Sequence, residues 1–569
     1  MRNPVLAAAC LAAVAVTTAP PMATAQAPAA KAAKAARASS KPATTAAITV
    51  ADLRHRSFVY ADDSMGGRGT ATIGHVKATN YIAAELARIG ATPAGDNGTF
   101  FQAVPIVVRA PDASTVPSVN GTRFESGKDY IARDQGPGMR SIDGAAVVFG
   151  GTAGDTASMI SPEAAAGKFV LLAVPSGASP TPNRQILTRR YIRAAGIGVI
   201  SLERLPDELK AALSQSGPTL AGSTPNAPSL PVYAYLSTAM ANAMLGAPVT
   251  SAASGAAGGT ITGTIRFVEQ PTEHPVRNVV AIVPGSDPTL KSQYVVLGAH
   301  SDHIGYEVGT NYDSDSVRIG NQLFRKGGAD EAPVTLTAAQ RDTLKAKLTA
   351  VRGNAPARRD SIYNGADDDG SGSMGLLEVA EYFAANPKLR PSRSLLFVWH
   401  TSEELGLWGS EWYTDHPTVP RDSIVAAINI DMIGRGSKTD IPNGGDDYIQ
   451  LLGSRRLSTV YGDFVETVAK AAPHALRLDY TFDAPGHPQQ YYCRSDHWNY
   501  ARYGIPTVFF STGGHGDYHM VSDEAAYLDY PHFRRVVQFV ADLAQKAGNR
   551  VGGFPLDKPV PGPNAQCVQ

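Results

Sequence analysis

The sequence predicts an α/β fold in which a largely parallel, mixed sheet is flanked by helices and a smaller β-rich domain is inserted. Three observations support this prediction. In the second half of the chain, short apolar runs alternate with helical patterns, which indicates crossover connections between parallel strands. Between residues 121 and 264, short apolar runs are instead separated by Gly, Ser and Pro, as expected for strands joined by turns. The length of 569 residues, 43% of them hydrophobic, allows more than one core.

The composition excludes two classes of protein. Lys and Arg (51) balance Asp and Glu (51), so nothing predicts binding to nucleic acid. Gly (55) and Pro (40) are frequent but lack the strict period of a collagen-like fibre. A globular protein with folded cores is therefore expected.

The N-terminus has the pattern of a secretory signal in residues 1–25. Arg2 precedes an apolar stretch from Val5 to Val16, and the small residues Ala23-Thr24-Ala25 follow it. This stretch is too short to span a bilayer, which needs roughly 20 residues. A buried N-terminal helix is the alternative. We expect cleavage after Ala25, a secreted or periplasmic protein, and no stable membrane anchor after cleavage.

The remaining elements follow in order along the chain. Residues 26–47 have the composition of a disordered linker. The segment 48–120 carries a helix at 75–89. The insert 121–264 has predicted strands at 145–149, 169–174, 197–202 and 230–235, with helices at 183–195 and 237–245. The domain 265–553 has strands at 294–299, 394–399, 424–430 and 505–510, with helices at 373–385, 457–471 and 532–547. Residues 306–360 form a polar excursion with a helix near 335–348, and 554–569 form a tail.

Potential metal ligands follow the four strands predicted in the domain 265–553. They are His300, the pair Glu403 and Glu404, Asp431, and His519. Carboxyl ends of parallel strands meet at one edge of a sheet, so residues 219 positions apart can converge. The acidic triplet Asp367 to Asp369 lies on the loop that opens the helix from Ser373, and it adds a fifth ligand.

Two imidazoles with three carboxylates are a ligand mixture that Zn²⁺ accepts, whereas Ca²⁺ prefers more oxygens and no His. Five ligands exceed the need of one catalytic zinc, but a two-metal site with one bridging carboxylate uses all of them. Asp302 lies two residues after His300 and can accept the other imidazole proton.

Glu403 and Glu404 are adjacent, so in extended backbone one can reach a metal while the other faces a water molecule as general base. Taken singly, each feature has an ordinary explanation. A Glu pair is usually solvated surface, and an acidic triplet is as often a turn or a helix cap. Their joint occurrence at strand ends favours a metal-dependent hydrolase.

Five motifs then resemble the co-catalytic di-zinc aminopeptidases of peptidase clan MH, a family that includes aminopeptidase Y, secreted bacterial aminopeptidases and glutamate carboxypeptidase II. The motifs are Gly-Ala-His-Ser-Asp-His (298–303), Asn-Gly-Ala-Asp-Asp-Asp-Gly-Ser-Gly (364–372), Thr-Ser-Glu-Glu-Leu-Gly-Leu-Trp-Gly-Ser (401–410), Asn-Ile-Asp-Met-Ile-Gly-Arg (429–435) and Asp-Tyr-His-Met-Val-Ser-Asp (517–523). The resemblance covers about 270–550 and implies that 265–553 is a zinc-peptidase catalytic domain. In the insert, Gly-Lys-Phe-Val-Leu-Leu and Ala-Ala-Gly-Ile-Gly-Val-Ile resemble a protease-associated domain, for which we expect a non-catalytic role as a lid or spacer.

The resemblance also implies roles for individual residues. Asp368 bridges two Zn²⁺ ions, His300 and Asp431 complete one site, and Glu404 and His519 complete the other. Glu403 is the general base and Asp302 orients His300. The peptide bond between Asp368 and Asp369 is cis. Further expected site residues are Tyr518, as an oxyanion donor or a structural phenol, Arg494, in a segment lining the pocket, and His497, as a substrate contact or a structural hydrogen-bonding group.

The expected reaction is removal of N-terminal residues from peptides by an aminopeptidase. Short peptides are favoured over proteins, because 68 positions separate His300 from Asp368 and the extra chain can restrict the crevice. One alternative is a carboxypeptidase for acidic C-termini, with Arg435 or Arg494 as the carboxylate clamp. A mono-zinc glutaminyl cyclase and a metal-free receptor-like module are the others, and the complete ligand set argues against both. Cys493 and Cys567 permit one disulfide, and the sequence leaves their pairing open.

Overall fold

The computed structural model describes residues 44–135, 139–214, 217–222, 229–307, 309–353, 355–441, 443–471 and 474–569. The predicted signal peptide and most of the predicted linker lie outside these ranges. Within them, no helix combines the length and apolar character needed to cross a membrane.

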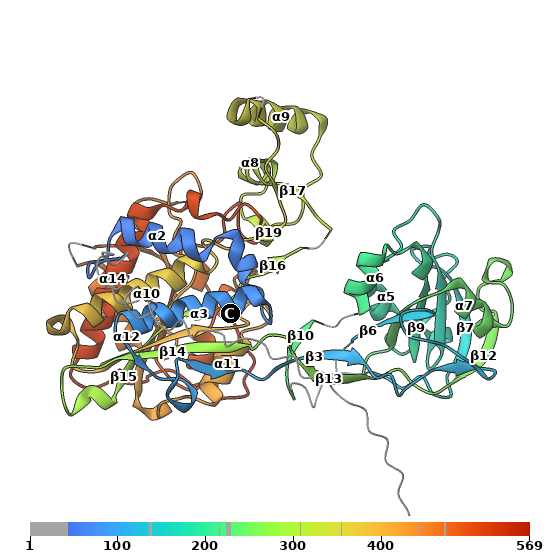
Figure 1. Ribbon diagram of the computed structural model, residues 1–569, viewed down its shortest axis with the longest axis horizontal. Coiled ribbons are helices and arrows are strands. Elements are labelled where there is room, and N and C mark those ends of the chain that lie inside the picture. The colour runs from blue at the N-terminus through green and yellow to red at the C-terminus, as the bar shows by residue number, and fades with distance from the viewer. Residues whose placement is uncertain are drawn as a thin grey trace, which may run out of the picture. The chain divides into compact units, whose positions relative to one another are not determined.

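A nine-stranded mixed sheet forms the centre of the C-terminal half (Figure 1). Its strand order is β1-β14-β20-β15-β21-β24-β22-β23, with β2 also paired to β14. Strands β20, β15, β21 and β24 are mutually parallel, whereas β14 and β22 run antiparallel to their neighbours β20 and β24. The bounds are β1 Thr92–Pro93, β2 Phe101–Ala103, β14 Arg277–Val283, β15 Tyr294–His300, β20 Ser394–His400, β21 Ile424–Ile430, β22 Tyr448–Leu452, β23 Arg477–Asp479 and β24 Thr507–Ser511. The predicted fold class is confirmed, with a parallel centre and antiparallel strands outside it.

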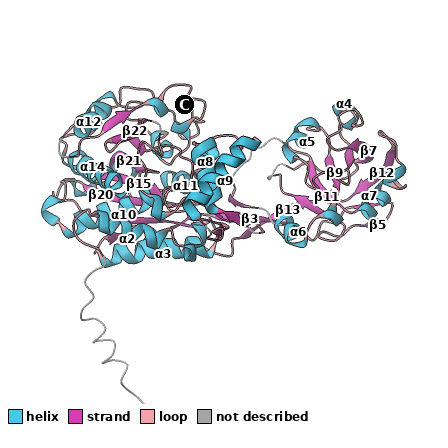
Figure 2. Ribbon diagram, turned by 90° about the horizontal axis from the view of Figure 1, so that it is seen from above, coloured by secondary structure: helices cyan, strands magenta, loops and turns pink. Residues whose placement is uncertain are grey.

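Helices cover both faces of this sheet because its central strands are apolar on both sides. Val295 and Leu297 of β15 belong to the larger core with helices α2, α3, α10, α12 and α14, while Val296 belongs to a second core on the opposite face. Tyr413 of α11 and Tyr500 of α13 complete that second core. Figure 2 shows α10 and α14 in cyan beside the magenta strands. The bounds are α2 Val50–Tyr60, α3 Ile73–Arg88, α10 Gly370–Ala385, α11 Trp408–Asp415, α12 Thr459–Ala469, α13 His497–Ala501 and α14 Tyr530–Asn549.

The described part of the chain begins at Thr44, near the end of the predicted linker. Thr44 is buried, and its hydroxyl donates to Glu381 Oε2 at 2.7 Å. Glu381 also pairs with Arg56 of α2, whose Nε lies 2.9 Å from Glu378 Oε2. Composition could not reveal that a buried ion cluster satisfies the Thr44 hydroxyl; the linker at residues 26–47 stays a prediction.

The segment predicted as an insert contains an eight-stranded sheet with the order β5-β4-β12-β7-β8-β9-β11-β6. Strands β7, β8, β9 and β11 are parallel and carry apolar side chains on both faces. The bounds are β4 Ser118–Val119, β5 Thr122–Arg123, β6 Tyr130–Arg133, β7 Ala146–Thr152, β8 Phe169–Ala173, β9 Gly196–Ile200, β11 Val232–Leu236 and β12 Ala257–Thr262, with helices α4 Pro162–Ala165, α5 Arg184–Arg190, α6 Asp207–Ser214 and α7 Thr238–Leu245. A three-stranded sheet of β3 (Ile106–Pro111), β10 (Pro218–Leu220) and β13 (Phe267–Pro271) joins the chain entering this region to the chain leaving it. The identity of the insert 121–264 as a protease-associated domain stays a prediction.

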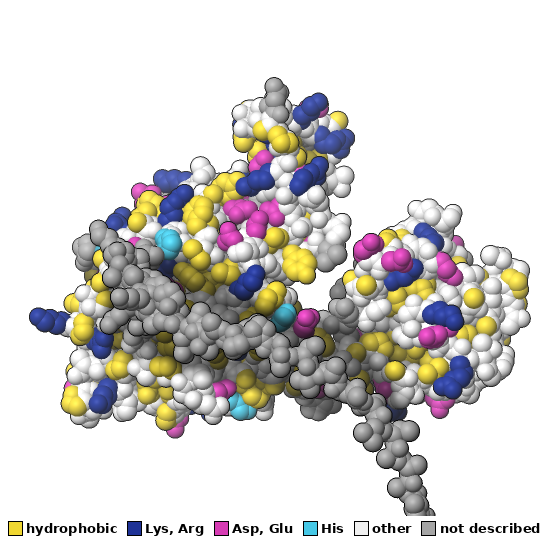
Figure 3. Space-filling model, viewed as in Figure 1, with side chains coloured by type: hydrophobic (Ala, Val, Ile, Leu, Met, Phe, Trp, Pro, Cys, Tyr) yellow, Lys and Arg dark blue, Asp and Glu magenta, His cyan; other side chains and the backbone are white. Residues whose placement is uncertain are grey.

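The polar excursion after β15 has its own small framework. Two short antiparallel pairs, β16 (Gly305–Tyr306) with β19 (Ile362–Tyr363) and β17 (Tyr312–Asp313) with β18 (Arg359–Asp360), close its base. Helices α8 (Ser314–Phe324) and α9 (Ala338–Arg352) fill it. The predicted helix corresponds to α9, whereas α8 was not predicted. No α9 residue is buried, and Figure 3 shows Lys and Arg side chains at its surface.

Candidate metal centre

The predicted metal ligands converge on the two carboxylate oxygens of Asp368. His300 Nε2 lies 3.1 Å from Asp368 Oδ1 and 3.5 Å from Asp431 Oδ1. On the other side, His519 Nε2 lies 2.9 Å from Asp368 Oδ2 and 3.0 Å from Glu404 Oε2. Each side therefore has one imidazole and one further carboxylate facing the same aspartate.

The fold explains this convergence. His300 is the last residue of β15, Asp431 follows β21, and Glu404 follows β20. These parallel strands are neighbours, so their carboxyl ends lie at one edge of the sheet. Asp368 lies on the loop before α10, and the peptide bond that follows it is cis, as the resemblance implies.

The other two carboxylates of the acidic triplet have different partners. Asp369 accepts hydrogen bonds from the amides of Gly372 and Met432 at 2.8 and 3.1 Å, and from the amide of His300 at 3.0 Å. Asp367 accepts from the Gly434 amide at 2.7 Å and lies 3.1 Å from His515 Nε2. Although Asp369 lies close to His300 and Asp431, its oxygens already position backbone.

The adjacent glutamates point to different places, as their predicted division of labour requires. Glu404 reaches His519, whereas Glu403 lines the cavity with its nearest carboxylate oxygen 3.9 Å from His300 Nε2. Burial raises the pKa of Glu403 well above its usual value; His300 opposes this shift and Glu404 adds to it. Coulombic and hydrogen-bonding contacts with imidazoles instead hold the pKa of Asp368 well below its usual value, against the effect of burial. Neighbouring carboxylates with opposite pKa shifts are typical of functional sites.

Asp302 contacts His300 in a different way from the predicted one. The Nδ1 atom of His300 lies 3.1 Å from the backbone carbonyl of Asp302 and 3.8 Å from its nearest carboxylate oxygen. That carboxylate instead accepts from the Glu403 amide and the Thr70 hydroxyl, both at 3.1 Å. The predicted side-chain contact is therefore replaced by a backbone contact, and the side chain fixes the start of the glutamate segment.

Two residues beside the ligands had no predicted role. His303 is fully buried, and its Nδ1 lies 2.7 Å from Glu404 Oε1. Ser495 donates to Asp431 Oδ2 at 2.7 Å and accepts from Asn429 Nδ2 at 2.8 Å. His303 lies in the first of the five motifs and Ser495 follows Arg494, but neither has a partner nearby in the chain that would have revealed its role.

A small cavity beside the cluster contains two of the three predicted substrate contacts. Arg494 and Tyr518 line it, and Arg494 Nη2 donates to the Tyr518 hydroxyl at 2.8 Å. His497 does not line it, because its buried ring lies against Phe509 and Tyr492 at centroid distances of 4.8 and 5.0 Å. The predicted substrate contact of His497 is thus not supported, and the residue belongs to the packing behind the cavity.

The structure also separates the two candidate carboxylate clamps. Arg435 is fully buried, with its guanidinium 2.8 Å from Asp517 and 3.1 Å from Asp440. It cannot contact a substrate. Arg494 is the only arginine among the described residues that line this cavity.

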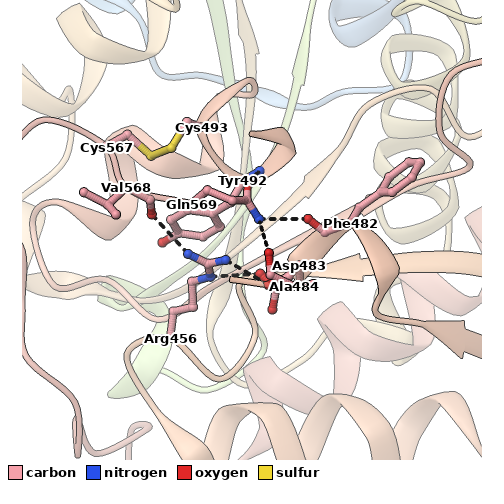
Figure 4. The surroundings of a disulfide bond; sticks show 9 residues. All are labelled: Arg456, Phe482, Asp483, Ala484, Tyr492, Cys493, Cys567, Val568 and Gln569. Atoms are coloured by element: carbon pink, nitrogen blue, oxygen red, sulfur yellow. Dashed lines mark hydrogen bonds and ion pairs between the residues drawn. A yellow bond between two sulfur atoms is a disulfide. The ribbon is translucent and has the colours of Figure 1, made fainter. Parts of the chain in front are cut away.

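A disulfide holds the C-terminal tail against the segment that carries Arg494. Cys493 pairs with Cys567 at a Cα–Cα distance of 5.6 Å (Figure 4). The Gln569 side chain donates to the Phe482 and Ala484 carbonyls at 3.0 and 3.1 Å, and its oxygen accepts from the Tyr492 amide. The tail is therefore part of the fold.

Fold and cluster together define a candidate metallohydrolase, and comparison with known proteins shows what this chain is similar to. Residues 278–544, somewhat less than half of the chain, match the model of peptidase family M28. It is 26% identical over 219 residues to aminopeptidase Y of Saccharomyces cerevisiae, covering 35% of this chain and 36% of that protein. It is 24% identical over 282 residues to leucine aminopeptidase 1 of Trichophyton equinum, covering 47% of this chain and 58% of that protein.

The matched segments thus span between about a third and three fifths of these relatives. Among solved structures, a zinc aminopeptidase from Bacillus subtilis named BSAP aligns with a TM-score of 0.45 and 14% identity, over 89% of this chain and 96% of that chain.

Proposed function

We propose that this protein is a secreted di-zinc aminopeptidase that removes N-terminal residues from peptides. The observation that carries the proposal is the placement of two imidazole and carboxylate pairs on the two oxygens of Asp368. In this proposal, His300, Asp368 and Asp431 hold one Zn²⁺, and Asp368, Glu404 and His519 hold the other.

The residues present fit such ions. Asp368 Oδ2 and Glu404 Oε1 are buried but receive no well-aligned hydrogen bond within the described chain. Imidazole nitrogens lie only 2.9 and 2.7 Å from them. The approach of His519 Nε2 to Asp368 Oδ2 without alignment as a hydrogen bond is what two ligand atoms aimed at a shared cation would show. The mixture of nitrogen and oxygen ligands suits zinc.

Bound zinc supplies Lewis acidity, which polarises the scissile carbonyl and lowers the pKa of a water molecule. The protein supplies the proton transfers. Glu403 faces the cavity and is not among the proposed ligands, so its carboxylate can take a proton from the attacking water and return it to the leaving amine.

Tyr518 is suited to stabilise the developing oxyanion. Its hydroxyl oxygen already accepts a hydrogen bond from Arg494 Nη2 at 2.8 Å, so its own proton remains available to a carbonyl oxygen in the cavity. A preset donor of this kind favours the tetrahedral transition state over the planar peptide.

The charges of the cavity favour an aminopeptidase over a carboxypeptidase. Glu403 is an acidic lining residue that is neither a proposed zinc ligand nor paired with an arginine, unlike Asp368, Asp431 and Asp330. Arg494 is paired with Asp330 at 2.9 Å, and Arg435 is inaccessible. A substrate ammonium group therefore finds more complementary charge than a substrate carboxylate. The relatives named as aminopeptidases agree with this choice.

The direction of cleavage is tested with three substrates. Leucine p-nitroanilide carries a free amine, N-acetyl-leucine p-nitroanilide lacks it, and a peptide with a C-terminal glutamate tests the carboxypeptidase alternative. Only the first should be cleaved rapidly. Equal cleavage of the acetylated compound or release of the C-terminal glutamate would contradict the aminopeptidase proposal while leaving the metal centre open.

The location of the protein is proposed from residues 1–25 alone. Expression of the full chain in a bacterium with export machinery should yield a mature protein that begins after Ala25. N-terminal mass spectrometry of the exported fraction checks this expectation. A full-length protein confined to the cell interior would contradict it.

A further inference from the structure

The excursion between β15 and Asp368 is attached to the loop that carries His519. Arg318 of α8 pairs with Asp517, and Asn321 Nδ2 donates to the Gly516 carbonyl at 2.8 Å. The amide of Ala329 donates to the Tyr518 carbonyl at 3.1 Å. These contacts fix the excursion beside the cavity.

One glycine allows this close approach. Gly328 has φ +57°, and a Cβ at this position would lie 2.5 Å from the His515 carbonyl oxygen and 2.8 Å from that of Tyr518. A larger residue would therefore separate the excursion from the loop. The short turn Gly328–Asp330 ends with its last side chain in the cavity wall.

Asp330 uses both carboxylate oxygens there. Oδ1 lies 2.9 Å from Arg494 Nη1, and Oδ2 accepts from the Tyr491 hydroxyl at 2.7 Å. Its backbone carbonyl accepts from Gln489 Nε2 at 3.0 Å, and its side chain is only 9% exposed. The carboxylate is thus held in place, and it neutralises the one arginine that lines the cavity.

We propose that Asp330 determines substrate specificity by occupying Arg494, so that the enzyme prefers peptides whose N-terminal side chain is uncharged. Arg494 has one terminal nitrogen on Asp330 and the other on Tyr518, which leaves no unpaired Lys or Arg among the described residues lining the cavity. An acidic side chain entering the cavity would lose water without gaining a partner. Met432 and Phe509 in the same wall offer apolar contact instead. This inference rests on the aminopeptidase proposal and assigns a role to the excursion.

The test compares kcat/KM for glutamate and leucine p-nitroanilides. Asp330→Asn keeps the size of the side chain and removes its charge, which frees Arg494 to bind the glutamate carboxylate. The ratio of glutamate to leucine turnover should rise by roughly ten- to a hundredfold, the contribution expected of one hydrogen bond to a charged group. Adding Arg494→Gln should cancel the gain. Asp342→Asn, at an exposed position on α9, removes the same charge and should leave the ratio unchanged.

Two further measurements keep the outcome decisive. Asp330→Glu retains the charge and should keep a ratio close to that of the wild type. Calorimetric binding of free L-glutamate should tighten in Asp330→Asn relative to L-leucine, which reports on the cavity without turnover. A folded Asp330→Asn enzyme with an unchanged ratio, or with a selective loss of N-terminal lysine substrates, would overturn the inference. Failure of the wild type to cleave any amine substrate would instead count against the proposed function.

Discussion

At the scale of single residues, the site separates adjacent carboxylates by what their oxygens already contact. Asp367 and Asp369 are held by backbone amides, whereas Asp368 faces two imidazoles. Glu404 meets His519 and His303, whereas Glu403 faces the cavity. Residues of one type and adjacent in sequence can therefore serve as ligand, base or support according to geometry alone.

Glu403→Gln should retain zinc but lose turnover by roughly 10²- to 10⁴-fold, because the amide cannot take a proton from water. Glu404→Gln is the matched control and should instead bind less zinc. Metal analysis together with kcat on dialysed protein distinguishes the two variants. The opposite pattern would reverse the roles assigned to this pair.

His303→Ala should weaken zinc binding by roughly 10- to 100-fold, the usual effect of losing a residue that orients a metal ligand. Its imidazole contacts Glu404 Oε1, and without it that carboxylate can rotate away. Competition with a chromogenic chelator measures the affinity. The exposed His416→Ala provides the control, and equal affinity in both variants would show that His303 only packs.

At the scale of elements, the central part of the fold could be predicted from sequence because its signals are local. The runs at 294–299, 394–399 and 424–430 match β15, β20 and β21 within one residue, and each is long, apolar and followed by a polar residue. The outer strands β22 and β23, only five and three residues long, were not predicted. β23 has too few residues to show a period, whereas β22 is as long as the predicted β24 but has Gln450 within its apolar run.

The distinction between features with a local sequence signal and features without one also applies to the site. All five predicted ligands lie together because each follows a recognisable strand or opens a helix. The contacts of Ser495 with Asp431 and of Asp330 with Arg494 join residues 64 and 164 positions apart. Nothing local in the sequence encodes such pairs, so they required the structure.

The disulfide between the tail and the segment of Arg494 should stabilise the fold. It closes a loop between residues 74 positions apart, for which the chain-entropy model gives roughly 4.4 kcal/mol. Cys567→Ser should therefore lower the melting temperature by several degrees and raise KM, since Arg494 adjoins Cys493. Val568→Ala, at a side chain that is 75% exposed, is the control. A wild type insensitive to reductant and a Cys567→Ser variant of equal stability would contradict this expectation.

At the scale of the whole molecule, the metal centre connects parts of the chain that are far apart in sequence. Its proposed ligands extend from His300 to His519 and come from four strand ends and the loop before α10. Ions that bind only the folded arrangement add their binding free energy to folding. The site is then a source of stability as well as of chemistry.

Removing the metal should therefore lower the stability of the entire catalytic domain. Zinc at 100 times its dissociation constant contributes about 2.7 kcal/mol per independent site, so chelated wild-type protein should melt several degrees lower and recover when zinc returns. His519→Ala should keep part of this response, because His300, Asp368 and Asp431 remain. Asp368→Ala should lose nearly all of it, because Asp368 contacts the imidazoles of both proposed sites. Melting curves of the three proteins, with and without zinc, make the comparison; a full zinc response in Asp368→Ala would show that the two sites do not share this residue.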